Sequence, residues 1–133
     1  MRIAVLATSL LLCSACGGDD DGTDADRFGV GAQCTVAEED LCDDDLDDDF
    51  DLVCLTDFKG GYCGLEDCEA NIDCPDGSAC VLHDDGQTYC FRICLDKSEC
   101  NFNRDAENEA NCSSSIDFVE DTGVKACVPP SGS

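Results

Sequence analysis

The sequence predicts a small disulfide-rich fold: three tandem four-Cys modules of short β-hairpins and loops, with little helix, after a disordered tether. Fourteen of the 133 residues are Cys, a fraction above the roughly 8 to 10% that marks a disulfide scaffold in a short secreted chain. Twelve of these Cys form three sets of four, and the gaps between sets are shorter than any gap within them, which indicates an internal repeat. With no Trp, two Tyr and six Phe, the chain can build only a small hydrophobic core.

Residues 1–15 have the features of an export signal peptide. Arg2 precedes a ten-residue, mostly apolar run from Ile3 to Leu12, and the small residues Ser14 and Ala15 follow. This run is too short to cross a bilayer as a helix, which needs about 20 residues.

The residues around Cys16 carry a second export feature. The stretch from Leu12 through Cys13-Ser14-Ala15-Cys16-Gly17-Gly18 resembles the lipobox of bacterial lipoproteins, in which the Cys after a small pair is diacylated and becomes the mature N-terminus. Cys13 stands where that family usually has Leu. Cleavage before Cys16 and its acylation would leave twelve of the 14 Cys, an even number that can pair completely. The resemblance therefore implies a membrane protein held by a lipid on Cys16.

The lipobox resemblance also implies a cellular location for the protein. Gly17 and Gly18 stand where well-studied lipoproteins carry the Asp that retains them at the inner membrane, so it implies the outer membrane or cell surface of a Gram-negative-type bacterium. One alternative is ordinary cleavage after Ala15, which would give a periplasmic or secreted protein with a free thiol on Cys16. A redox role for Cys13 and Cys16 is disfavoured, because this C-x-x-C lies in the leader without a strand before it or a helix after it.

Residues 16–32 are expected to form the lipidated Cys and a disordered acidic tether. Gly17 to Gly31 are rich in Gly and Asp, and only Phe28 and Val30 are sizeable apolar residues. Such a segment buries too little apolar surface to offset the entropy of ordering.

Three Cys modules follow at residues 34–63, 68–90 and 94–127, before a flexible tail at 128–133. In each module a turn rich in Gly or Asp separates two β-prone runs, which predicts a hairpin. The paired runs are 53–56 with 62–65, 79–83 with 88–93, and 116–119 with 124–128. The candidate disulfide residues are Cys34, Cys42, Cys54, Cys63, Cys68, Cys74, Cys80, Cys90, Cys94, Cys100, Cys112 and Cys127.

The pairing of these Cys has three possibilities in each set of four. A lone two-stranded hairpin is marginally stable, and two disulfides, each worth about 2 to 4 kcal/mol, would stabilise it. We favour first to third and second to fourth, because this pairing staples the preceding loop across both hairpin strands.

The central module carries a second resemblance. Its stretch Cys68-Glu-Ala-Asn-Ile-Asp-Cys74-Pro-Asp-Gly-Ser-Ala-Cys80-Val-Leu resembles the short repeats of secreted bacterial cysteine-rich proteins. It is also similar to the EB-type and Dickkopf-type N-terminal cysteine-rich modules. The resemblance implies an extracellular interaction module and supplies no catalytic residue.

An acidic run of seven Asp in eleven residues separates Cys42 from Cys54. In an extended strand side chains alternate between faces, so one face would carry a carboxylate row of Asp43, Asp45, Asp47, Asp49 and Asp51. Oxygen ligands in such a row suit Ca²⁺, although an EF-hand is excluded because Asp48 and Cys54 occupy its Gly and Glu positions. The alternatives are a solvated acidic loop and a surface for a basic protein or polycation.

Charge and missing motifs limit the possible functions. A net charge of −24 is expected to repel anionic lipid headgroups as well as DNA and RNA, and it excludes nucleic-acid binding. The single His, His83, is expected to be an exposed turn residue, and no phosphate loop or G-x-S-x-G elbow occurs, so we expect no enzyme and no required cofactor.

Three functions remain. The first is a non-catalytic, lipid-anchored surface module that contacts a protein or polycation. Its candidate contact residues are the acidic run and the aromatics Phe58, Tyr62, Tyr89 and Phe102, although Tyr62 and Tyr89, each beside a Cys, could instead pack over disulfides. The second is a Ca²⁺-binding module that uses the carboxylate row. The third is a small blocker similar to a protease inhibitor.

Overall fold

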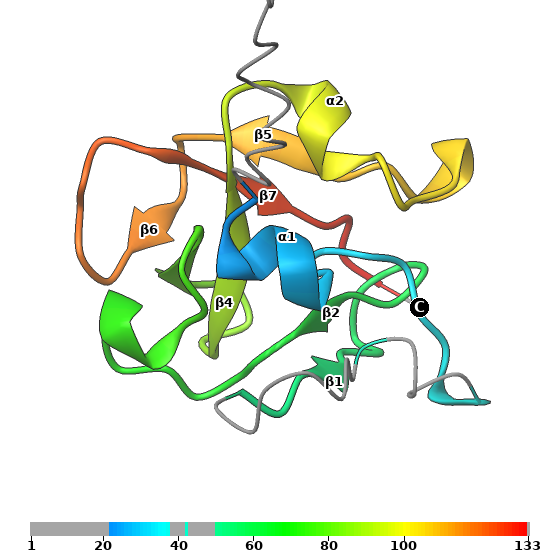
Figure 1. Ribbon diagram of the computed structural model, residues 1–133, viewed down its shortest axis with the longest axis horizontal. Coiled ribbons are helices and arrows are strands. Elements are labelled where there is room, and N and C mark those ends of the chain that lie inside the picture. The colour runs from blue at the N-terminus through cyan, green and yellow to red at the C-terminus, as the bar shows by residue number, and fades with distance from the viewer. Residues whose placement is uncertain (1–21, 38–41, 43–49, 133) are drawn as a thin grey trace, which may run out of the picture.

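The computed structural model (Figure 1) describes residues 22–37, 42 and 50–132. Short antiparallel strands dominate this part of the chain, and its helices are short, as predicted. None of the helices among these residues is long and apolar enough to cross a membrane. The helices are α1 (Asp24–Phe28) and α2 (Lys97–Cys100), with single 3₁₀ turns at Asn71–Asp73 and Ala106–Asn108. The strands are β1 (Val53–Cys54), β2 (Cys63–Gly64), β3 (Ser78–Leu82), β4 (Thr88–Cys94), β5 (Asn111–Ser113), β6 (Asp117–Phe118) and β7 (Lys125–Val128).

Two of the three predicted hairpins are confirmed. β1 pairs with β2 in a two-stranded sheet, in which Cys54 lies opposite Cys63. β3 pairs with β4 over five residue pairs, with Cys80 opposite Cys90. Gly86 provides the positive φ of 85° that the β3–β4 turn requires.

The third predicted hairpin, 116–119 with 124–128, is wrong. Within the described chain, β7 is flanked by β4 on one side and β5 on the other, in a five-stranded sheet of order β5-β7-β4-β3-β6. Both edges of β7 are therefore occupied, and β6 pairs instead with β3, placing Phe118 opposite Val81. This arrangement lets Ile116 and Phe118 pack against the main core.

Six disulfides link the twelve Cys in the favoured order, first to third and second to fourth in every set. Each bond closes a loop within its own set, and the longest sequence separation is 27 residues. The pairs are Cys34–Cys54, Cys42–Cys63, Cys68–Cys80, Cys74–Cys90, Cys94–Cys112 and Cys100–Cys127. So many disulfides are typical of an extracellular or otherwise oxidising compartment.

The hydrophobic core crosses the boundaries between the sets. Phe58 and Tyr62 from the first set pack against Tyr89 at the end of the second set and Phe91 just after it, with ring centroids 5.1 to 5.7 Å apart. Ala126 from the third set belongs to the same buried cluster. The expectation that Phe58, Tyr62 and Tyr89 are contact residues is therefore wrong, because they are at most 2% exposed. These rings join the sets into one packed unit.

The predicted tether is shorter than expected. Thr23 caps α1 and forms a capping box with Asp26, which stabilises the start of the helix. Ala25 and Val30 are buried in the main core. The backbone N–H of Ala25 donates to the carbonyl of Asp76 at 2.7 Å. Residues 23–32 thus belong to the folded unit, and residues 16–21 lie outside the described chain.

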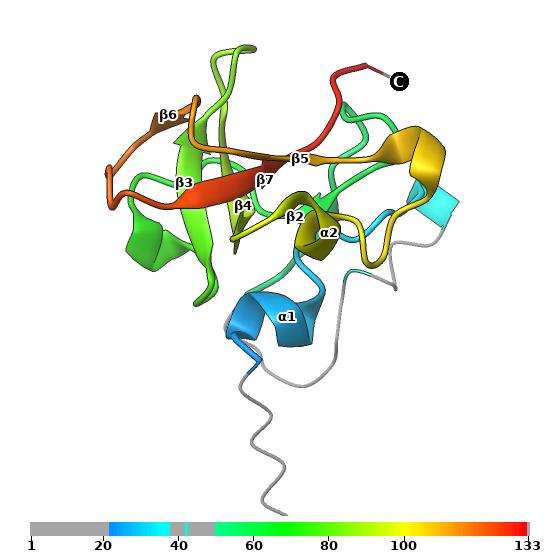
Figure 2. The ribbon, with the colours of Figure 1, turned by 90° about the horizontal axis from the view of Figure 1, so that it is seen from above.

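The predicted flexible tail also packs on the body. Val128 ends β7, and Ser131 forms an antiparallel bridge with Phe58. The backbone N–H of Lys59 donates to the carbonyl of Pro130 at 3.0 Å. In Figure 2 this end of the chain lies near the top of the view, as does the turn between β3 and β4, whereas α1 lies at the bottom.

Candidate contact surface

The acidic run predicted from the sequence falls mostly outside the described residues. Asp43, Asp45, Asp47 and Asp49 belong to that part of the chain, as does the proposed lipidation residue Cys16. Asp51 is described and exposed. Ca²⁺ binding by this row therefore stays a prediction. Among the four candidate contact aromatics only Phe102 is exposed, at 86%.

A different group of carboxylates gathers where the β3–β4 turn ends the larger sheet. Asp84 and Asp85 lie in the turn itself, and Asp117 lies opposite Leu82 at the end of β3. The charges of Asp57, Glu66 and Asp85 act on the Tyr89 hydroxyl, and Glu66 bridges to Tyr89. All of these acids are exposed. We name this group the hairpin-end acidic surface: Asp57, Glu66, Asp84, Asp85 and Asp117.

Asp85 is held in place by hydrogen bonds. Its carboxylate accepts hydrogen bonds from the Tyr89 hydroxyl at 2.8 Å and from the backbone N–H of Gln87 at 2.9 Å. Partial burial raises the pKa of Asp85, but these hydrogen bonds and the nearby His83 outweigh burial, and the pKa lies below its usual value. Asp85 is therefore a fixed negative charge that orders the turn.

His83 is not the exposed turn residue expected from the sequence. Its side chain is 10% exposed, and its ring packs edge-on against Phe58 at a centroid distance of 5.2 Å. Nδ1 is buried without a hydrogen-bond partner, 3.5 Å from the Asp85 carboxylate. The turn bends the His83 ring back over the aromatic core, a contact that the local sequence does not reveal.

A small hollow of about 120 Å³ beside His83 also contains Ser115. Acyl-transfer enzymes need a hydrogen bond between such a Ser and His. Among the described residues the structure shows no bond between Ser115 and His83. The hollow therefore lacks the contact that would activate a nucleophile.

The basic side chains do not neutralise the hairpin-end acidic surface. Arg104 is 8% exposed, and its guanidinium donates only to backbone carbonyls. Those carbonyls belong to Gly31 (3.2 Å), Lys59 (2.9 Å), Gly61 (2.8 Å) and Asn108 (2.8 Å). The guanidinium carbon also lies 5.7 Å from the centroid of the Tyr62 ring, within the range of a cation–π contact. The local sequence does not reveal this role of Arg104, because three of its four acceptors are 43, 45 and 73 residues away.

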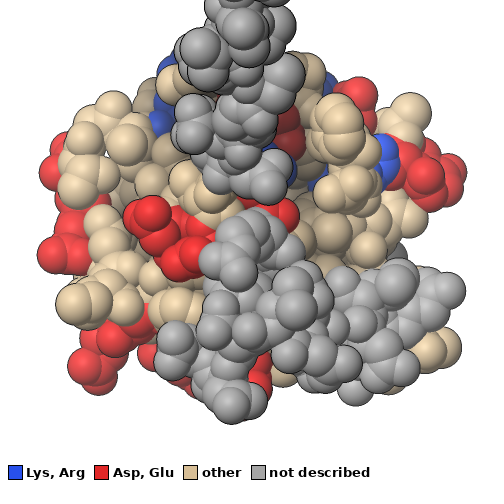
Figure 3. Space-filling model, in the orientation of Figure 1, with Lys and Arg blue, Asp and Glu red and all other residues tan. Residues whose placement is uncertain are grey.

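Three of the other four cations whose side chains are described form contacts elsewhere, and the charge of the fourth, Lys125, acts on Asp96. Arg92 forms an ion pair with Asp26, and Lys97 pairs with Glu109 at 2.7 Å. Lys59 donates to the carbonyl of Glu107 at 2.9 Å. In the described chain no Lys or Arg forms an ion pair with the hairpin-end acidic surface. Acidic side chains also outnumber basic ones on the face of the molecule that Figure 3 displays.

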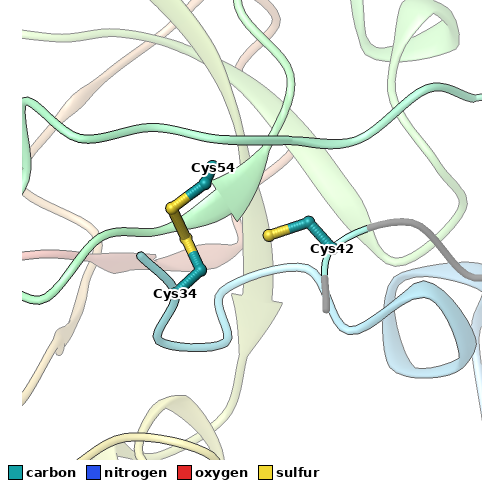
Figure 4. Close-up of side chains that lie close together, drawn as sticks. All are labelled: Cys34, Cys42 and Cys54. Carbon is teal, nitrogen blue, oxygen red and sulfur yellow. A yellow bond between two sulfur atoms is a disulfide. The ribbon is translucent and has the colours of Figure 1, made fainter. Parts of the chain in front are cut away.

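The Cys residues also form close groups. In each set, three sulfur atoms lie within 4.8 Å of one another, and Figure 4 shows the group of Cys34, Cys42 and Cys54. Metal binding by Cys requires free thiolates, whereas every sulfur in these groups is in a disulfide. Within the described ranges no carboxylates or His form such a group. The Cys groups are cross-links of the scaffold.

Comparison with known proteins finds no matching family model, no matching curated protein and no matching solved structure.

Proposed function

We propose that this protein is a lipid-anchored, extracytoplasmic, non-catalytic module that binds a basic protein or polycation through the hairpin-end acidic surface. The lipobox resemblance at Cys16 supports the anchor, and the six disulfides agree with an extracytoplasmic location. The observation that carries the binding proposal is the set of five exposed carboxylates at one end of the sheet, none of them paired with a Lys or Arg side chain of the described residues.

The structure gives this surface two properties that suit a cationic partner. Exposed carboxylates that lack a Lys or Arg partner among the described residues create a field that attracts an opposite charge and speeds its association. The turn that carries Asp85 is held by hydrogen bonds and by packing of His83 on Phe58. A fixed surface loses less conformational entropy when a partner binds.

The test compares two variants that remove the same charge. D57N/E66Q/D84N neutralises three acids of the surface and spares Asp85, which orders the turn. The control E69Q/D76N/E107Q removes three exposed acids elsewhere. An oligolysine peptide is titrated into each protein by calorimetry at low and at physiological salt.

We expect saturable binding to the parent protein that weakens as salt rises, because salt screens exposed charges. The surface variant should bind several-fold more weakly than the control variant. An equal loss of peptide affinity in both variants would mean that net charge alone attracts the peptide, and it would contradict the assignment of this surface. An absence of saturable binding at low salt would contradict the proposed function.

A further inference from the structure

We propose that the end of the molecule where α1 docks faces the membrane, and that Ile72 and Leu95 insert into the lipid interface beside the anchor. This inference rests on the proposed lipidation of Cys16. It adds a second, apolar contact between the folded unit and the bilayer, and it fixes which end of the protein points away from the lipid.

Ile72 and Leu95 are unusually exposed for their chemistry. They are 87% and 81% exposed, and of the other large apolar side chains in the described chain only Phe102 is as open. Full burial of a large apolar side chain is favourable. Two such side chains that lie together on the surface therefore mark a contact surface.

The two side chains flank the point where the chain enters the folded unit. Leu95 lines a surface hollow with Thr23 and Asp26, and Ile72 lines a second hollow with Asp24. Gly77 and Ile93 line both hollows, so the hollows adjoin. An attachment through Cys16 would therefore join the folded unit on the side that carries this apolar pair.

The number of residues between Cys16 and Thr23 limits how far the folded unit can lie from the lipid. Thr23 follows Cys16 by seven residues, a span of at most about 25 Å even when fully extended. The headgroup region on one side of a bilayer is about 5 to 8 Å thick. A lipidated Cys16 therefore holds Thr23 within reach of the interface.

α1 is joined to the sheet by several contacts, so the point where the chain enters the folded unit is fixed on the sheet. The N–H of Ala25 bonds to Asp76, Arg92 pairs with Asp26, and Thr23 packs against Gly77. A Cβ atom on Gly77 would lie 2.2 Å from the Thr23 hydroxyl, which shows how closely the two backbones approach.

β3 then sets the direction of the opposite end. It runs from Ser78, beside α1, to Leu82, next to the turn that carries Asp84 and Asp85. The five steps from Gly77 to Leu82 along a strand cover about 17 Å. Figure 2 shows the same relation, with α1 at the bottom and the β3–β4 turn at the top. The hairpin-end acidic surface would thus point into the medium, away from the membrane.

Exposed Asp76 lines the same hollow as Ile72. A carboxylate is costly to move into hydrocarbon, so we expect insertion at the level of the headgroups and no deeper. Aliphatic side chains beside polar groups suit this interfacial depth.

The absence of Trp from the chain allows a direct test. The single-Trp variants I72W and L95W are prepared as the lipidated protein, and L82W is the matched control at the far end of β3. Mass spectrometry first verifies the lipid on Cys16 and the six disulfides. Each protein is then bound to phosphatidylcholine vesicles whose acyl chains carry bromine near the headgroup, which quenches nearby Trp fluorescence.

We expect the Trp emission of I72W and of L95W to shift to shorter wavelength and to be quenched, while the emission of L82W does neither. Lipidated protein without quenching in any of the three variants would overturn this inference and leave the anchor intact. Native protein without lipid would instead overturn the anchor. The emission of I72W and L95W is also measured at several protein concentrations before vesicles are added. A shift with concentration would assign this face to a second copy of the chain, and it would also overturn the inference.

Discussion

Arg104 shows how one buried cation can join segments that are far apart in sequence. Its acceptors belong to the chain leaving α1, to the turn between β1 and β2, and to the 3₁₀ turn at Ala106–Asn108. Carbonyl oxygens carry partial negative charge, so they can stabilise a guanidinium without a carboxylate. Hydrogen bonds to charged groups contribute about 1.5 to 3 kcal/mol each.

The first prediction concerns Arg104. R104M removes the donors and leaves four carbonyls without this partner, so we expect a loss of about 2 to 4 kcal/mol in the free energy of unfolding. Denaturant unfolding followed by circular dichroism measures this free energy. The control K97M breaks the exposed pair with Glu109 and should change stability by less than about 1 kcal/mol. Similar losses in both variants would contradict the role given to Arg104.

Two buried hydroxyls make stability depend on pH. The Tyr62 hydroxyl donates to the carbonyl of Cys127 at 3.2 Å and accepts from the backbone N–H of Arg92 at 3.0 Å. Burial raises the pKa of Tyr62. The pKa of Tyr89 is also raised, first by burial and then by its hydrogen bond to Asp85 and the charges of Asp85, Asp57 and Glu66.

The second prediction follows from the sign of these shifts. Tyrosines in the unfolded chain ionise near pH 10, whereas the folded protein keeps both hydroxyls protonated. Their contribution is complete below about pH 10 and is lost as pH rises above it. The free energy of unfolding should therefore fall above about pH 10, and less steeply in Y62F/Y89F. Ionisation of all tyrosines near pH 10 while the protein stays folded would contradict this.

Among the secondary-structure elements, the sequence predicted two hairpins correctly because their signals are local. A Gly-containing turn lies between two β-prone runs in each, and the strands pair with their nearest neighbours. The third failed because β6 and β7 each find partners in other parts of the sheet. Turn chemistry cannot reveal such competition between strands.

α1 was missed for a related reason. Its composition is that of a disordered segment, and it is stabilised by contacts made at a distance, such as Ala25 on Asp76 and Thr23 on Gly77. The capping pair of Thr23 and Asp26 was the local signal that could have indicated a helix start.

The third prediction tests the docking of α1. Gly77 has φ of 88°, and a Cβ atom there would strike Thr23. Gly86 has nearly the same φ, 85°, with open space around it. G86A should cost only the backbone strain of about 1 to 2 kcal/mol, and G77A should cost more because α1 must also move. Equal effects on the denaturation midpoint would contradict tight docking.

For the whole molecule, the disulfide framework was readable from the sequence and the packing was not. Cys spacing defines sets whose bonds stay local, whereas the core depends on which apolar residues turn inward. Tyr62 and Tyr89 each lie beside a Cys, and they bury their rings in a cluster shared with Phe58 and Phe91. The hairpin-end acidic surface likewise cannot be predicted from the sequence, because Asp57, Glu66 and Asp117 are far apart along the chain and only the fold brings them together.

The intact mass of the native protein, purified from membranes, tests most directly whether the molecule is a lipid-anchored module with all twelve module Cys in disulfides. We predict a mature chain that begins at a diacylated Cys16 and weighs twelve hydrogens less than its reduced form because of six disulfides. A mature chain without lipid, with a free thiol on Cys16, would contradict the account.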